Sequence, residues 1–218
     1  MAVATCAWAQ GTNELAAYLN RGARRFERRV LLQEHVSFGP NEMHVLDFDG
    51  DGVLDLVVTN GNNMELPDPP LRPYHGVRVY LGDGALGFRE AAFHPMYGAL
   101  TSVVRDLDGD GDLDLAVNGF YPDWRAEEPE TFHVVENLGR SPGDDGRFAL
   151  AARGLRGEAW NRWLRVEAGD LDGDGRPALY LGAGNVPGGG LNPARPRQWA
   201  RYRELLAKAP AVLVLERR

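Results

Sequence analysis

One acidic pattern occurs three times in this chain, and it limits the possible folds more than any other feature. The copies are DFDGDGVLDL from Asp47, DLDGDGDLDL from Asp106 and DLDGDGRPAL from Asp170. Each copy sets aspartates at alternate positions between glycines and then continues into apolar residues. Carboxylates this close repel one another, so such a loop is costly unless a cation lies among them. A pitch of roughly sixty residues indicates an internal repeat of small supersecondary units.

The alternating aspartates predict a calcium site in each loop. Positions one, three and five supply carboxylates, a glycine at position six lets the chain turn, and position seven supplies a backbone carbonyl. Position nine adds a further acid in the first two copies. Hard oxygen ligands in this number suit Ca²⁺ better than Mg²⁺, which keeps more of its water. The predicted ligands are Asp47, Asp49, Asp51, Val53 and Asp55 in the first loop, Asp106, Asp108, Asp110, Asp112 and Asp114 in the second, and Asp170, Asp172, Asp174 and Arg176 in the third.

The third loop departs from the pattern at one position. Ala178 stands where the first two loops have Asp55 and Asp114, and the cation Arg176 lies nearby. Because calcium affinity depends on the number of charged ligands, the missing acid weakens this site. We therefore expect two strong Ca²⁺ sites and one weaker site.

The calcium loop of an EF-hand opens with the same aspartates and is the main alternative. An EF-hand requires a bidentate glutamate at position twelve and a helix on each side. Position twelve is Val58, Val117 and Leu181 in the three copies. The flanking segments, such as MHVLDF before the first loop and VLDLVVTN within and after it, are short apolar runs typical of strands. The loops are therefore expected to join antiparallel strands.

A second pattern repeats between the acidic loops. Residues 18–28, 80–90 and 135–150 each form a strand pattern, a glycine-containing turn and a second strand that begins near a phenylalanine. One repeat therefore contains four strands. Four-stranded antiparallel units in series are the blades of a β-propeller, so the sequence predicts an all-β chain of this class.

The acidic loops, the strand order and the pitch of roughly sixty residues resemble FG-GAP repeats, also called VCBS repeats, which are known from the propeller of the integrin α-subunit. The resemblance covers nearly the whole chain. It implies a β-propeller fold with Ca²⁺ in the loops at 47–55, 106–114 and 170–176. It implies no single function, because proteins that share a fold of this kind differ widely in what they do.

The strand count predicts a partial propeller. The chain divides into a partial blade at residues 1–33, blades at 41–100 and 101–160, and a partial terminal blade at 161–218. The expected tally of three, four, four and three strands amounts to about three and a half blades, whereas closed propellers have about four to eight. We therefore expect the missing blades or a second chain to complete the ring. Apolar residues at helical spacing predict a short helix at 199–206.

Aromatic and polar residues gather in the segments expected on the rim opposite the acidic loops. Flat rings offer contact area at low entropic cost, which suits recognition of sugars or extended peptides. The resemblance agrees, since integrin propellers bind ligands on the face away from calcium. The alternative is that several of these rings pack between blades. The candidate ligand-binding residues are Tyr74, His75, Tyr121, Asp123, Trp124, Trp160 and Trp163.

The charge and the cysteine content narrow the function classes. Twelve of the 31 acidic residues are aspartates of the three loops, so the formal net charge of −7 reflects the predicted metal sites. Nothing in the sequence supports nucleic-acid binding. The single cysteine forms no internal disulfide. No apolar run approaches the ~20 residues of a membrane span. Loops of this kind bind at extracellular Ca²⁺ levels of roughly 10⁻⁴–10⁻³ M. We therefore expect an extracellular or periplasmic location, with a secretion signal outside this chain.

These features favour a binding or adhesion module over an enzyme. The five histidines show no zinc spacing, and no G-x-S-x-G or Cys/His arrangement occurs. A pair of His75 and Asp123 across adjacent blades is the acid–base arrangement that an enzyme could use, and nothing in the sequence fixes their separation. We therefore expect a non-catalytic module that recognises a carbohydrate or a protein. The alternative is a propeller-based carbohydrate lyase or hydrolase, or the accessory module of one.

Overall fold

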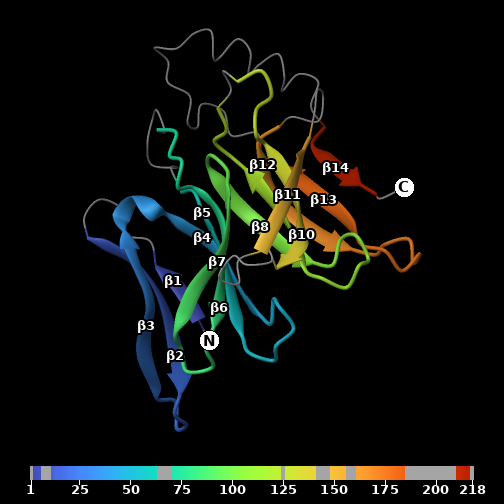
Figure 1. The fold of residues 1–218 in the computed structure, drawn as a ribbon. Helices are drawn as coiled ribbons and strands as arrows, with labels where there is room; N and C mark the ends of the chain where they lie inside the picture. Colours follow the sequence, from blue (N-terminus) through green and yellow to red (C-terminus); the bar gives the residue numbers. More distant parts are fainter. Residues whose placement is uncertain are drawn as a thin grey trace.

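The chain is built from β-strands. The computed structural model describes residues 11–62, 70–123, 126–140, 148–155, 161–184 and 210–216, and the backbone of residues 2–5. These residues form fourteen strands and one turn of 3₁₀-helix, η1 (Val36–Phe38), with no α-helix among them (Figure 1). The predicted all-β class is confirmed. The helix expected at residues 199–206 lies outside the described residues.

The strands form four antiparallel sheets that follow one another along the chain (Figure 1). The first sheet contains β1 (Ala2–Thr5), β2 (Thr12–Asn20) and β3 (Phe26–His35). The second contains β4 (Pro40–Leu46), β5 (Asp55–Asn60), β6 (Gly76–Gly82) and β7 (Phe88–Pro95). The third contains β8 (Ala99–Arg105), β9 (Asp114–Gly119), β10 (Phe132–Arg140) and β11 (Phe148–Gly154). The fourth contains β12 (Trp163–Gly169), β13 (Ala178–Ala183) and β14 (Val212–Leu215).

Each sheet is a meander, because strands that neighbour one another in sequence also pair in space. The described strands number three, four, four and three per sheet, as the strand pattern predicts. The first strands of the last three sheets, β4, β8 and β12, lie next to one another, and β1 lies beside β4. Four-stranded meanders whose first strands lie together are compatible with the blades of a β-propeller.

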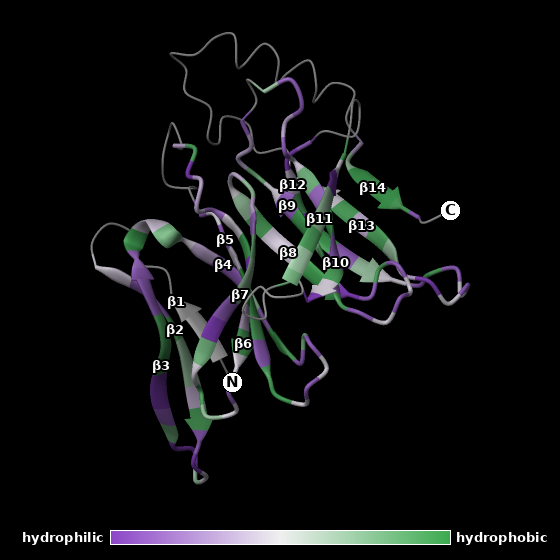
Figure 2. Cartoon of the chain, viewed as in Figure 1, coloured by the Kyte–Doolittle hydropathy of each residue, from purple (hydrophilic) through white to green (hydrophobic). Residues whose placement is uncertain are grey.

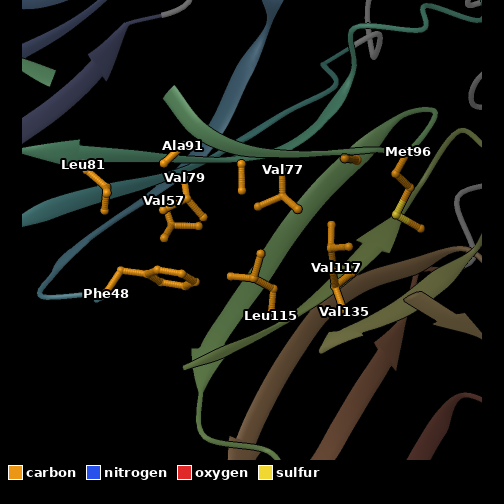
Figure 3. Close-up of a cluster of buried hydrophobic side chains, with 12 residues drawn as sticks. Phe48, Val57, Val77, Val79, Leu81, Ala91, Met96, Leu115, Val117 and Val135 are labelled. Carbon is orange, nitrogen blue, oxygen red and sulfur yellow. The ribbon is translucent and has the colours of Figure 1, made fainter. Parts of the chain in front are cut away.

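Three apolar clusters hold the sheets together. The first and second sheets share Leu15, Phe38, Leu56, Val58 and Tyr80. The second and third sheets share a larger cluster, in which Phe48, Val57 and Val79 face Leu115, Val117 and Val135 (Figure 3). The third and fourth sheets share Val103, Ala116, Phe132, Trp163, Val166, Leu179 and Leu181. Burial of these side chains, each contributing about 1.5–3 kcal/mol for a large aliphatic or aromatic group, is the main source of stability.

The second and third sheets are each covered on both faces, as their strands β5 and β9 show. Every residue of both strands is buried. Side chains alternate along a strand, so Leu56 and Val58 face the first sheet while Val57 faces the third. In β9, Ala116 likewise faces the fourth sheet. The outer strand β3 differs, since it carries a hydrophilic stretch that includes the exposed ion pair of Arg29 and Glu27 (Figure 2).

Candidate metal centre

The three acidic loops are hairpin connections of the same length. Each joins the first strand of a sheet to the second, and the residues that close the three hairpins occupy equivalent places. Leu46 pairs with Asp55, Arg105 with Asp114, and Gly169 with Ala178. The loops lie on one side of the molecule, away from the long connections that follow β5 and β9 (Figure 1, loops in cyan, yellow-green and orange). They therefore join antiparallel strands, and no helix flanks them among the described residues.

The backbone of each loop orients its first aspartate. One carboxylate oxygen (Oδ2) of Asp47 accepts a hydrogen bond from the Gly52 N–H, at 2.9 Å between oxygen and nitrogen. The equivalent bonds join Asp106 to Gly111 at 3.1 Å and Asp170 to Gly175 at 2.9 Å.

The position-six glycines Gly52, Gly111 and Gly175 have φ angles of 85°, 98° and 84°. A Cβ at these glycines would meet nothing within 4 Å. The requirement for glycine is therefore conformational, since L-residues with a Cβ rarely adopt this region.

The third and fifth positions are also oriented by the loop. Oδ1 of Asp108 accepts from the Asp110 N–H at 3.0 Å, and Oδ1 of Asp110 accepts from the Asp112 N–H at 2.9 Å. The third loop repeats both bonds, from the Asp174 N–H to Asp172 and from the Arg176 N–H to Asp174. The first loop repeats them with Asp49, Asp51 and Val53. The motif therefore folds through contacts between residues a few positions apart, which explains why three copies adopt one shape.

Carboxylate oxygens converge in all three loops. One oxygen from each of three aspartates lies within 4.8 Å of the others in the groups Asp47–Asp49–Asp55, Asp106–Asp108–Asp114 and Asp170–Asp172–Asp174. Calcium binds six to eight oxygens at about 2.3–2.6 Å, so opposite ligands stand about 5 Å apart. The donor set and its spacing therefore fit Ca²⁺. The predicted ligands Asp51 and Asp110 are outside these groups, as is Asp112, whose expected contribution is a backbone carbonyl.

The ninth-position aspartates have a second role that the sequence did not predict. Asp55 and Asp114 are each 1% exposed. Oδ2 of Asp114 accepts from the Leu107 N–H and Oδ1 accepts from the Asn137 N–H, both at 2.9 Å. Asp55 makes the same two bonds, to Phe48 and Gly82, both at 2.8 Å.

Each of these carboxylates therefore ties its loop to the third strand of its own sheet. Burial raises the pKa of both Asp55 and Asp114, and the backbone N–H bonds oppose that rise. The signal in the sequence is the position of each aspartate as the first residue of a strand, directly before three apolar residues, 56–58 in β5 and 115–117 in β9.

The third loop has no such anchor at Ala178. Its three converging aspartates are all exposed. Hydrogen bonds from backbone N–H groups, above all that of Gly175, lower the pKa of Asp170. Without this acid, the third loop lacks both a metal ligand and the hydrogen bonds that join the other two loops to their sheets.

The candidate ligand-binding residues do not form one exposed surface. Tyr74 is 39% exposed, and its hydroxyl donates to the Ser37 hydroxyl at 2.8 Å. Asp123 is half-buried, and its carbonyl accepts from the Ala126 N–H. Tyr121 is buried against Phe120. Trp124 and Trp160 lie outside the described residues.

His75 and Trp163 require correction, because both are fully buried. Nε2 of His75 lies 3.2 Å from the Ser37 carbonyl oxygen, and burial lowers the pKa of the ring to about 4. Trp163 packs in the cluster between the third and fourth sheets. Trp163 therefore serves packing, and His75 holds the connection before β6 against the Ser37 carbonyl of η1.

Comparison with known proteins agrees with the loop geometry. Residues 39–81 match the FG-GAP repeat family, and the match covers β4, the first acidic loop, β5 and most of β6. No curated protein matches the chain. Among the described residues no helix has the length and apolar character needed to cross a membrane. The chain thus carries an FG-GAP repeat at residues 39–81, within an all-β architecture of propeller-like sheets.

Proposed function

We propose that this protein is a propeller-type binding module whose three acidic loops bind Ca²⁺. The FG-GAP repeat supports a binding module of this architecture. The observation that carries the calcium proposal is the convergence of three carboxylate oxygens within 4.8 Å in each loop. A bound Ca²⁺ would supply positive charge that offsets the repulsion between these carboxylates.

Hydrogen bonds within the chain orient the carboxylates of the loops before a cation binds. In the second loop, backbone N–H groups orient Asp106 and Asp108, and Asp114 is held by N–H groups of the loop itself and of β10. Little reorganisation is then needed when a cation binds, which favours affinity. The module acts outside the cytoplasm in this proposal, because oxygen sites of this kind bind Ca²⁺ at the levels found there.

The binding partner in this proposal is a carbohydrate or a protein on the rim opposite the acidic loops. Tyr74, at 39% exposure, is the candidate that the described part of this rim presents to solvent most openly. Binding is favoured over catalysis because His75, which an acid–base pair with Asp123 would need, is buried against the Ser37 carbonyl. A glycan array with the parent and the Tyr74→Ala variant separates carbohydrate recognition from protein recognition.

The calcium proposal is tested by thermal melting in chelator, in millimolar Ca²⁺ and in millimolar Mg²⁺. A ligand bound only by the native state adds about 2.7 kcal/mol at a hundredfold excess over its dissociation constant. We expect Ca²⁺ to raise the melting temperature by several degrees and Mg²⁺ to do so poorly. The matched control combines Asp47→Asn, Asp106→Asn and Asp170→Asn, and it should lose the response. Coincident melting curves in chelator and in Ca²⁺ would overturn the proposal.

A further inference from the structure

An arginine of the third sheet reaches the first acidic loop. Arg140 is the last residue of β10, and its guanidinium forms an ion pair with the Asp49 carboxylate. The two residues are 91 positions apart in the sequence. The Asp49 side chain is only 3% exposed, while that of Arg140 is 50% exposed. A positive charge of the chain itself therefore lies on one of the three aspartates that converge in this loop.

The ion pair belongs to a larger contact between the second and third sheets. Arg140 pairs with Phe148 across the β10–β11 hairpin, and its guanidinium lies 5.7 Å from the Phe148 ring centroid. The Phe148 ring meets Phe48 edge to face at 5.2 Å between centroids. Phe48 sits between Asp47 and Asp49 in the loop and points into the apolar cluster between the sheets (Figure 3). Both the polar and the apolar parts of the first loop thus contact the same hairpin.

The other two loops show no equivalent ion pair among the described residues. Within the described part of the chain, no ion pair joins a carboxylate of the second or third loop to a lysine, arginine or histidine. The first and second loops share the same acids at positions one, three, five and nine. Arg140 is therefore an electrostatic difference between two loops that match at these four positions, and position seven adds a second one, Val53 against Asp112.

We propose that Arg140 is an internal counter-ion of the first loop, which competes with a bound cation and lowers the affinity of this site. The inference rests on the proposed calcium function. A cation at the converging oxygens and a guanidinium on Asp49 repel each other, and a carboxylate this buried gains little screening from water. Because Arg140 is half exposed, it can turn toward solvent when a cation binds. Occupancy of the first loop then changes a contact between the second and third sheets.

The test isolates the first loop by placing Asp106→Asn and Asp170→Asn in the background and measuring Ca²⁺ binding by calorimetry. Arg140→Met removes the charge and keeps an unbranched apolar stem beside Phe148. Because Arg140 is half exposed, the pair is compared with surface ion pairs, which contribute up to about 1 kcal/mol, and we expect Ca²⁺ to bind about three- to fivefold more tightly. Arg140→Lys keeps the charge and should stay within about twofold of the parent. Arg29→Met removes an exposed arginine from the first sheet and is the matched charge control.

A second measurement needs no metal. In chelator, Asp49→Asn, Arg140→Met and their combination are compared by chemical denaturation, and coupled residues give midpoint shifts that do not add. Additive shifts would show that Asp49 and Arg140 are not coupled, which would contradict the ion pair. Unchanged or weaker Ca²⁺ binding by Arg140→Met, with binding by the parent intact, would overturn the competition and leave the proposed function standing. Absence of Ca²⁺ binding in both proteins would overturn the proposed function, and the competition with it.

Discussion

The second and third acidic loops share their turn and differ in how they attach to their sheets. Asp106 and Asp170 each accept a bond from the glycine at position six. The second loop is also fixed by the buried Asp114, which holds the start of the loop and the third strand of its sheet. Ala178 occupies that place in the third loop and offers no hydrogen-bonding side chain. Two properties of the repeat are therefore separable: the local turn that gathers carboxylates, and the anchor that fixes the turn to the sheet.

The largest expected effect concerns the anchor. Asp114→Ala removes two hydrogen bonds of a charged acceptor and leaves the buried Asn137 N–H and the half-buried Leu107 N–H without this partner, so we expect a loss of about 3–5 kcal/mol in the free energy of unfolding. The measurement is chemical denaturation in chelator, which excludes any contribution from bound metal. Asp112→Ala, at an exposed position of the same loop, is the control and should change stability by less than about 0.5 kcal/mol. A comparable loss in both variants would show that Asp114 is not an anchor.

The next effect concerns affinity. Calorimetry should show that Asp106→Ala removes a tighter Ca²⁺ site than Asp170→Ala does, with a difference of about tenfold or less, because one ligand and one anchor are absent from the third loop. Ala178→Asp restores the acid and should strengthen the third site. Equal losses from Asp106→Ala and Asp170→Ala would contradict our assignment of the ligands.

The smallest effect is a difference in titration, measured by carboxyl NMR on the metal-free protein. Burial raises the pKa of Asp114 above 3.8, whereas backbone N–H groups lower that of Asp170 below 3.8. A raised carboxyl pKa means that the fold prefers the protonated acid, so Asp114 adds stability as the pH falls through its raised pKa. Asp170 adds stability above pH 3.8 and loses it as the pH falls through its lowered pKa. The reverse order of the two pKa values would break the contrast between a buried anchor and an exposed ligand.

The sequence predicted the structural features that depend on residues close to one another in the chain. The acidic turns, the strands on each side of them and the four-strand units all follow from short-range patterns, as the bond from Gly111 to Asp106 illustrates. The anchoring role of Asp114 was missed because its partner Asn137 lies 23 positions away and is brought close only by pairing of the third strand. Trp163 was misplaced for a related reason, since periodicity does not reveal which way the first residue of a strand points.

The burial of β5 and β9 on both faces has a consequence for how this chain unfolds. Adjacent residues of one strand, such as Ala116 and Val117, support different neighbouring sheets, so a middle sheet cannot leave without uncovering two interfaces. Among the described residues, the first and fourth sheets each share only one such interface. If stability is a sum over nearest neighbours, these two sheets open before the middle sheets. Hydrogen exchange should accordingly be slowest in β5 and β9, whose amides report the last part of the molecule to open.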